Sequence, residues 1–494
     1  MTSPNAIPQP GPRLSGRLGP VAIVFMVVAA AAPLTVVMAS PIGIALTNGG
    51  GIPANYLLAG VILLLFAVGF TTMAHHMKDA GAFYSFVGAG LGRHLGSGAA
   101  FLALFTYLAI QTAIYAYLGF SVSALIVSFG GPATSWWIWT LVAIAVAAFL
   151  GHRDIDLSAK VLGVLLILEV LVIVVLSAAV VIRNGVSFDS FRPSVVTSGP
   201  LGLGVMMAFG GYSGFESTAI FRDEAKDPQR TIPRATYAAV IGIGVFYTLA
   251  TWLLVCAWGT GQVQAVALDH LATGDLVQVT AVDYVGQWLS DTIGVLICTS
   301  LFACAISFHN VVARYLHSLG RSRLVPVRLS ATHPTHQSPY VASLLVTVVS
   351  AVLLGLWLLL GWDPLTQVFT WISSTGALGI MGLFVLASAS VVVFFARTKL
   401  DRRPWNTVIA PILALIGLAI VGWTAISNID ALTGSTDSGL NTTLIAAPVV
   451  ALLIGVAVTA YVKKRHQTLW QDLRFEAREA GLVGQITETE GASA

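Results

Sequence analysis

Two acidic residues, Glu169 and Glu216, lie inside long apolar stretches, whereas the other Asp and Glu residues fall in more polar segments. An ionisable side chain in hydrocarbon costs at least about 2.5 kcal/mol, so a carboxyl group retained there is a functional candidate. Because a buried carboxyl group can exist in its neutral form, it can gain and lose a proton. We predict proton coupling at Glu169, and Glu216 is a second functional candidate. The alternatives are a protonated hydrogen-bond donor at Glu169 and a purely structural helix cap at Glu216.

Interruptions in two apolar stretches would expose backbone groups that can bind a small ligand. A proline within a helix removes one backbone hydrogen bond, and three glycines in five residues weaken the other helix. The ends of half-helices carry partial charges, so they could hold the carboxylate and the ammonium group of a zwitterion. The predicted binding residues are Ala31, Ala32, Pro33, Leu34 and Thr35 in the first stretch and Phe209, Gly210, Gly211, Tyr212, Ser213, Gly214 and Phe215 in the second.

Three further polar side chains, Tyr107, Gln111 and Tyr115, are spaced four residues apart, so they share one face of a helix. We predict that this face points inward and contributes to the same site. Polar side chains in a membrane bundle can also simply bridge helices, which is the alternative for each of the three. The aromatic residues Tyr212 and Phe215 are candidate gates, and Trp371 and Ser373 are candidates for closing the route between the helices.

The composition requires lipid around most of the chain. Of 494 residues, 56% are hydrophobic and only 10% are charged, too few to cover an ordinary soluble surface. The net charge of +3 gives no indication of a nucleic-acid partner. Three cysteines, all in apolar stretches, indicate neither a disulfide framework nor a metal site, and we expect no cofactor.

Apolar stretches long enough to span a membrane recur along the chain, and they predict an all-α membrane protein of about twelve transmembrane helices. They lie approximately at 20–47, 55–74, 98–129, 132–150, 157–182, 201–221, 234–258, 291–316, 339–361, 363–396, 405–427 and 443–462. Residues 1–19 and 463–494 are predicted to be tails, the first of them disordered. Between them we expect a transport core at 20–397, with helices 1–5 at 20–182 and helices 6–10 at 201–397, and two extra helices at 405–462.

The positions of the basic residues support this count. With twelve spans, every Lys and Arg except Arg183 and Arg192 falls on one side of the membrane. Because basic residues accumulate in cytoplasmic segments, this asymmetry predicts that both termini are cytoplasmic. The pair His75 and His76 falls in a predicted cytoplasmic loop, where solvated histidines are commoner than metal ligands.

The two interruptions lie five helices apart, one in a helix that runs outward and one in a helix that runs inward. Corresponding breaks of this kind are typical of inverted-repeat transporters, in which a substrate binds near the middle of the membrane. Either break alone would be explained by a simple kink or by tight helix packing. Together they predict a five-plus-five inverted repeat with broken helices 1 and 6.

Several motifs resemble the amino acid/polyamine/organocation (APC) superfamily. The similar segments are 32–35, 81–84, 210–216, 222–235 and 310–326. The resemblance implies a central site between broken helices 1 and 6, with contributions from helices 3, 8 and 10. It places Glu216 where relatives have a glutamate implicated in gating or proton sensing, and Glu169 where some proton-coupled relatives have a lysine. Many members have a Gly-Ser-Gly-like break, whereas this chain has Ala-Pro-Leu-Thr at 32–35. Because the amides that would bind a carboxylate differ, substrates without a carboxylate, such as amines, are an alternative.

These observations predict a secondary active transporter of amino acids in the cytoplasmic membrane, working by alternating access and coupled to protons. The alternatives are a permease for polyamines or other amines and an amino acid exchanger. A membrane enzyme or a receptor is less favoured, because the spans hold no nucleophile with a base and no long soluble segment is present. The expected partners are a small-molecule substrate, a proton and the lipid bilayer. The sequence leaves open the particular substrate, the coupling ion and the oligomeric state.

Overall fold

A computed structural model describes residues 19–77, 83–152, 159–216, 218, 226–321, 323–333 and 338–465. Most of these residues lie in helices, in agreement with the predicted all-α membrane class. The predictions for residues 1–18, 81, 82, 219–225 and 466–494 lie outside the described residues. Residues 463–465, predicted to begin the second tail, lie in a helix.

Nine helical segments of the described ranges are long and apolar enough to cross a membrane. Their helices are α3 (Ile52–His76), α5 (Arg93–Ser128), α7 (Ala159–Asn184), α10 (Pro228–Trp258), α13 (Gln287–Arg321), α14 (Tyr340–Leu360), α15 (Thr370–Thr398), α16 (Ala410–Ser427) and α18 (Ser438–Arg465). Short π-helices, η5 (Pro364–Phe369) and η6 (Trp405–Ile409), lead directly into α15 and α16.

Shorter apolar helices fall in the remaining predicted stretches. They are α1 (Pro20–Ala31), α2 (Pro33–Leu46), α6 (Trp136–His152) and α9 (Leu201–Gly211). Two helices, α1 and α2, share the first stretch, and α9 ends ten residues before the predicted end of its stretch. The length of an apolar run therefore located the helices, and α1, α2 and α9 lie in the two stretches predicted to be interrupted.

Some short helices were not predicted, because they are not long or apolar enough to be recognised as spans. They are α4 (Phe83–Leu91), α8 (Pro193–Val196), α11 (Val263–Asp269), α12 (Leu276–Tyr284), α17 (Ile429–Thr433) and the 3-10 turns η1 (Gly49–Gly51), η2 (Asp189–Phe191) and η4 (Val327–Ser330). One of them, α11, has a clear role: Gln264 donates hydrogen bonds to the carbonyl oxygens of Ala45 and Thr47, each at 3.2 Å. It thereby satisfies carbonyl groups that the end of α2 leaves without partners.

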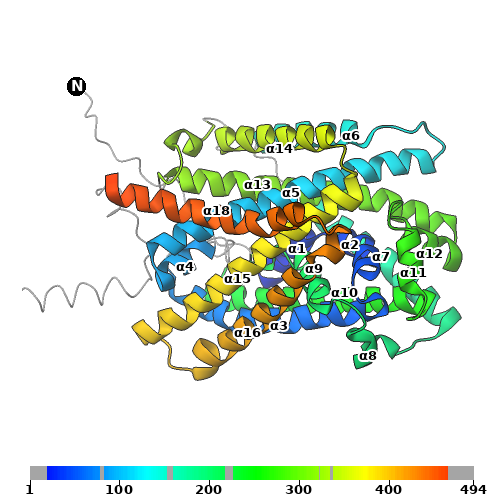
Figure 1. Cartoon of the computed structure of the whole chain (residues 1–494), viewed down its shortest axis with the longest axis horizontal. Helices are drawn as coiled ribbons and strands as arrows, with labels where there is room; N and C mark the ends of the chain where they lie inside the picture. Colours follow the sequence, from blue (N-terminus) through cyan, green and yellow to red (C-terminus); the bar gives the residue numbers. More distant parts are fainter. Residues whose placement is uncertain are drawn as a thin grey trace, which may run out of the picture.

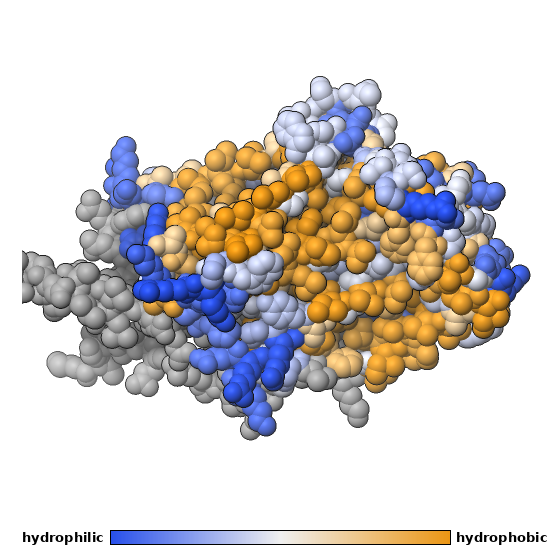
Figure 2. All heavy atoms as spheres, turned by 90° about the horizontal axis from the view of Figure 1, so that it is seen from below, coloured by the Kyte–Doolittle hydropathy of each residue, from blue (hydrophilic) through white to orange (hydrophobic). Residues whose placement is uncertain are grey.

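The long helices run roughly along the longest axis of the molecule (Figure 1). The end of α18 lies at one extreme of this axis, and α11 and α12 lie toward the other (Figure 1). Figure 2 shows a face on which apolar residues cover the middle and hydrophilic residues gather mostly toward the two ends. Large apolar side chains such as Ile182, Leu359 and Trp423 are 83%, 88% and 76% exposed, as expected for contact with lipid.

Small residues allow α5 and α18 to approach closely. A Cβ atom added at Gly455 on α18 would lie 2.4 Å from the carbonyl oxygen of Ser97 and 2.9 Å from the Cα of Gly98, both on α5. Because these are backbone atoms, they cannot move without separating the helices. Close backbone approach at small residues is a main source of helix association in membranes.

We expect Gly455→Ala to lower the free energy of unfolding by about 1–3 kcal/mol, the usual cost of overpacking. Gly242→Ala is the matched control, since a Cβ at Gly242 on α10 meets no atom within 4 Å. Thermal unfolding of the two purified variants in the same detergent checks the difference. Equal stability of the two variants would show that the α5–α18 contact tolerates a methyl group.

Candidate functional site

The first predicted break is present in the structure. The helix α1 ends at Ala31, Ala32 adopts a left-handed conformation with φ 47° and ψ 72°, and α2 starts at Pro33. A non-glycine residue in this region is strained by roughly 1–2 kcal/mol, and Pro33 offers no N–H group that could continue the helix. Such local strain is typical of functional positions.

Side chains from two other helices contact the two ends created by this break. On α7, Glu169 accepts hydrogen bonds at Oε2 from the backbone N–H of Leu34 at 3.2 Å and from the hydroxyl of Ser300 at 3.0 Å. On α10, the hydroxyl of Tyr247 donates to the carbonyl oxygen of Ala31 at 3.4 Å. The amide that the sequence suggested for a ligand carboxylate is therefore occupied by a carboxylate of the protein itself. Glu169 is 4% exposed.

The second break follows the end of α9 at Gly211. The N–H groups of Tyr212 and Ser213 turn back onto the carbonyl oxygens of Phe209 and Gly210, each at 3.1 Å, and Gly214 has φ 111°. Only glycine adopts this φ without strain. These contacts interrupt the regular helical ladder, in agreement with the predicted interruption at the glycine cluster.

The carboxylate of Glu216 lies directly beyond the second break. Its Oε2 accepts from the backbone N–H of Gly214 at 2.9 Å, and its Oε1 accepts from the hydroxyl of Tyr107 on α5 at 2.8 Å. The two contacts link the break to α5. Tyr107 was predicted to line the site, and the structure instead brings its hydroxyl to Glu216.

Aromatic side chains around the second break point into the packed core. The hydroxyl of Tyr212 donates to the carbonyl oxygen of Tyr56 at 2.8 Å and lies where Cβ atoms on Gly60 and Gly244 would approach within 2.7 Å. The ring of Phe215 packs against Phe66 and Phe384 at centroid distances of 6.0 and 5.7 Å, and Phe209 packs against Phe384 at 6.4 Å. None of Phe209, Tyr212 and Phe215 lines the cavity described next.

A hollow that is partly open to solvent lies between the two breaks. Five of the predicted binding residues line it: Ala31, Thr35, Gly210, Gly211 and Ser213. Ser373 also lines it, whereas Trp371 packs against Trp362 at a centroid distance of 5.2 Å. Among the described residues that form its wall, none carries a charge. Of the residues predicted at the two interruptions, Ala32, Pro33, Leu34 and Gly214 form the breaks themselves and do not line the hollow.

Much of the apolar wall was not predicted. It includes Ile110 and Ile114 on α5, Phe308 on α13, Met207 on α9 and Phe369 in η5. On α5 the two isoleucines directly precede Gln111 and Tyr115, so the lining face is rotated by about 100° from the polar face that drew attention in the sequence. An isoleucine among many apolar residues carries no signal that distinguishes a binding wall from a lipid or core contact.

The polar face of α5 instead contacts two neighbouring helices. The side-chain nitrogen Nε2 of Gln111 lies 3.4 Å from the hydroxyl of Tyr115 and 3.3 Å from Nδ1 of His309 on α13. Nε2 of His309 in turn lies 2.8 Å from the hydroxyl of Ser343 on α14. The structure therefore places Gln111 and Tyr115 in a network that joins α5, α13 and α14, which is the helix-bridging alternative.

One hydroxyl group of the wall is available to a ligand. Ser213 is 3% exposed, lines the hollow and has no hydrogen-bond partner among the described residues. A buried polar atom without a partner costs about 1–3 kcal/mol, so a ligand that supplies the missing hydrogen bond is favoured there.

We expect Ser213→Ala to raise the Kd for substrate about fivefold, which corresponds to the loss of one hydrogen bond worth about 1 kcal/mol. The matched control is Ser388→Ala, since Ser388 on α15 is also buried and unpartnered in the described structure but lies outside the wall. Scintillation proximity binding of labelled substrate measures both Kd values. An unchanged Kd in Ser213→Ala would remove this hydroxyl from the binding site.

A comparison with known protein families identifies the family of this chain. A model of the amino acid permease family matches residues 22–471. The chain belongs to the amino acid permease family. This membership confirms the APC superfamily resemblance and shows that the permease is a membrane transporter of amino acids or related amines.

Individual relatives of this permease are distant. It is 23% identical over 401 residues to the branched-chain amino acid permease BcaP of Bacillus subtilis (strain 168), covering 76% of this chain and 80% of the relative. It is also 23% identical over 343 residues to the low-affinity putrescine importer PlaP of Escherichia coli (strain K12), covering 67% and 72%. By their names, one of these relatives acts on amino acids and the other on a diamine.

Proposed function

We propose that this permease is a secondary active transporter that carries neutral amino acids with apolar side chains across the cytoplasmic membrane by alternating access. The observation that carries the proposal is the uncharged hollow bordered by both helix breaks. Its apolar walls suit a hydrocarbon side chain, while the few polar groups at the breaks suit the two charged ends of an amino acid.

In the proposed complex, the substrate carboxylate lies near the start of α2, where Thr35 lines the hollow and the helix dipole favours negative charge. The ammonium group lies toward the carbonyl ends of α1 and α9, near Ala31 and Gly211. Ser213 donates to or accepts from one of these groups. The side chain of the substrate packs on Ile110, Ile114 and Phe308 on the opposite wall.

Proton coupling is assigned to Glu169. An ionised carboxylate accepts strongly from both the N–H of Leu34 and the hydroxyl of Ser300, and protonation weakens both contacts. Since these contacts join α2, α7 and α13, the protonation state of Glu169 can favour one facing state over the other. Only such a differential interaction moves the equilibrium between two states.

Gating is assigned to Glu216 and its partner Tyr107. We propose that the chain has twelve spans arranged as a five-plus-five inverted repeat with two extra helices, and that both termini face the cytoplasm. On this assignment, the hydrogen bond between Tyr107 and Glu216 lies between the hollow and the cytoplasm and must break when substrate is released inward.

A permease for amines is a second candidate, favoured by one specific observation. Because Glu169 already occupies the amide of Leu34, the first break offers fewer donors to a substrate carboxylate than the sequence suggested. A substrate without a carboxylate would not need those donors. One relative, PlaP, is a putrescine importer by name.

Uptake into proteoliposomes tests the proposed function. The purified permease is reconstituted and supplied with labelled leucine, lysine, glutamate or putrescine, with and without an inward proton gradient. We expect leucine accumulation that requires the gradient. Counterflow of leucine without any response to the gradient would identify an exchanger, and the absence of both uptake and counterflow for every compound would overturn the transport proposal.

A further inference from the structure

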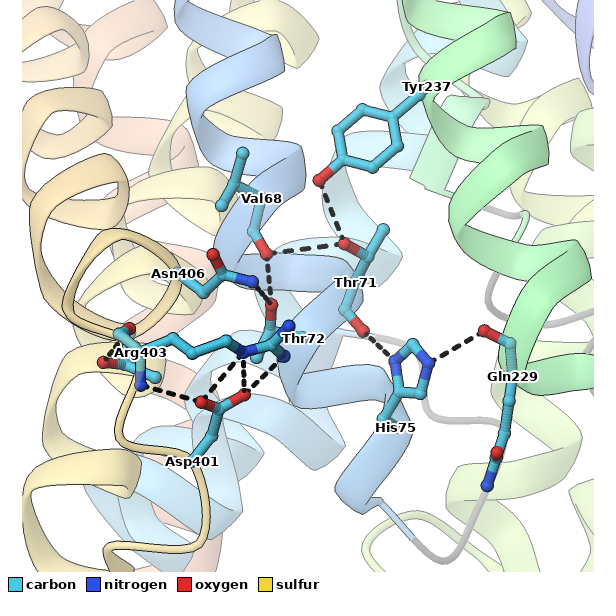
Figure 3. A network of polar contacts seen from close by, with 10 residues as sticks. Val68, Thr71, Thr72, His75, Gln229, Tyr237, Asp401, Arg403 and Asn406 are labelled. Carbon is cyan, nitrogen blue, oxygen red and sulfur yellow. Dashed lines mark hydrogen bonds and ion pairs between the residues drawn. The ribbon is translucent and has the colours of Figure 1, made fainter.

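A histidine at the end of α3 joins this helix to α10. The sequence placed His75 in a loop, but α3 continues through His76, so the ring of His75 stands in the last turn of the helix. Its Nδ1 lies 2.8 Å from the carbonyl oxygen of Thr71, one turn earlier. Its Nε2 lies 2.8 Å from the carbonyl oxygen of Gln229 on α10, and Figure 3 shows the ring between the two helices.

Both partners of His75 are carbonyl oxygens, which can only accept hydrogen bonds. Neutral imidazole has one N–H donor and one bare nitrogen, whereas imidazolium has two donors. Two short contacts to acceptors therefore require a proton on each ring nitrogen of His75. The geometry is that of the charged form.

The carbonyl of Gln229 is available because of a proline. In a regular helix this oxygen would accept from the N–H four residues later, and position 233 of α10 is Pro233, which has no N–H. The imidazole of His75 supplies the donor that Pro233 lacks. The partial negative charge at the carboxyl end of α3 also favours a cation in the last turn of this helix, where His75 lies.

We propose that protonated His75 is a clasp that fastens the first turn of α10 to the end of α3 and that opens when the ring loses a proton. The neutral ring keeps only one of the two hydrogen bonds, so the clasp responds to the pH of the solution at the end of α3.

No other ionisable group of the described structure makes a hydrogen bond or an ion pair with His75. Arg403 makes several contacts to Asp401, including one of 2.6 Å, and its hydrogen bonds lower the pKa of that carboxyl group below the usual range. Asp401 is thus occupied by Arg403, as Figure 3 shows. Among the described residues, the other charged and titratable groups in the last turn of α3, around the first turns of α10, and from the end of α15 to the start of η6 are His76, Lys226, Asp227, Arg230, Arg234, Tyr237, Arg397, Lys399, Asp401, Arg402 and Arg403.

The clasp is tested by the reactivity of a cysteine in the first turns of α10. Thr231 is 4% exposed, so Thr231→Cys, in a background with Cys256, Cys298 and Cys304 replaced by alanine, reports whether these turns detach. Maleimide labelling rates are divided by the rate of free cysteine at the same pH. We expect the ratio to rise about tenfold from acidic to alkaline pH, as the ring loses the proton that the second hydrogen bond needs.

Two variants separate the clasp from other effects of pH. His75→Gln cannot bridge both carbonyl groups, so its ratio is expected to be high at both pH values. Pro233→Ala gives the carbonyl of Gln229 an intrahelical donor that competes with His75, so its ratio is expected to depend less on pH than that of the parent. A ratio independent of pH in the parent, or a low ratio in His75→Gln, would overturn the proposal.

A measurement of the protonation of the His75 ring tests the proposal even if Thr231→Cys folds poorly. Nitrogen-15 NMR of histidine-labelled permease in nanodiscs, with His75→Gln for assignment, should show a proton on both ring nitrogens at acidic pH and on one at alkaline pH. A single protonated nitrogen at both pH values would also overturn it. Neither measurement depends on which substrate is carried.

Discussion

Replacement of Glu169 by glutamine is expected to abolish proton-driven accumulation of substrate while counterflow of substrate continues. Glutamine has nearly the same shape, and its carbonyl oxygen can still accept from the N–H of Leu34 and the hydroxyl of Ser300. It has no titratable proton, however. The first break is therefore preserved, whereas the proton-dependent bias between the two facing states is lost. We expect at least about a tenfold reduction in the accumulation ratio, since a bias of about 1.4 kcal/mol corresponds to that factor.

The control for this experiment is Ser300→Ala, which removes one donor to Glu169 but keeps the carboxyl group. It is expected to accumulate substrate in response to a proton gradient, although with a shifted pH dependence. Both variants are assayed in proteoliposomes, first for counterflow at equal pH and then for uptake with an imposed gradient. Full gradient-driven accumulation by Glu169→Gln would show that the proton is carried elsewhere.

Putrescine and lysine are expected to bind at least about thirtyfold more weakly than leucine. Each would bring an additional ammonium group into a hollow whose described wall has no charged side chain. A buried charge without a partner costs several kcal/mol, and even about 2 kcal/mol corresponds to this ratio. Competition of each compound against labelled leucine measures the affinities. Tighter binding of putrescine than of leucine would favour the amine permease.

A carboxylate placed on the wall should reverse this preference. Ile114 lines the hollow, and Ile114→Asp would supply a partner for a distal ammonium group. We expect the ratio of leucine to lysine affinity to fall at least about tenfold, as an ion pair compensates the buried charge. Ile114→Asn is the matched control, because it adds polarity of similar size without charge. An equal change in both variants would mean that polarity, not charge, excludes lysine.

The fold was largely predictable from the sequence, because apolar runs of sufficient length leave few alternatives to membrane helices. Pro33 and the glycines at 210–214 also located both interruptions, since their backbone chemistry conflicts with a regular helix. The short helices α11 and α12 were not predictable in the same way. Their apolar runs are brief, and α11 is held in place by contacts such as those of Gln264 to the end of α2, which involve residues far apart in the sequence.

The candidate site was predictable where a residue type is costly in a membrane. Glu169 and Glu216 stood out for that reason, and the structure places each at a helix break. The direction of a helix face was harder to infer. Gln111 and Tyr115 suggested a binding face, but a polar side chain can also satisfy a partner on a neighbouring helix, and His309 supplies one. The apolar wall formed by Ile110 and Ile114 required knowledge of how α5 is rotated.

The position of Tyr212 has a consequence for how the molecule divides during transport. Its hydroxyl group is wedged between Gly60 on α3 and Gly244 on α10, and its own backbone belongs to the second break. Sliding α3 against α10, or pulling the break away from either, would drive this hydroxyl into a helix backbone. These three parts should therefore move as one unit. The opposite wall, with Ile110, Ile114 and Phe308 on α5 and α13, would then form the frame against which that unit rocks.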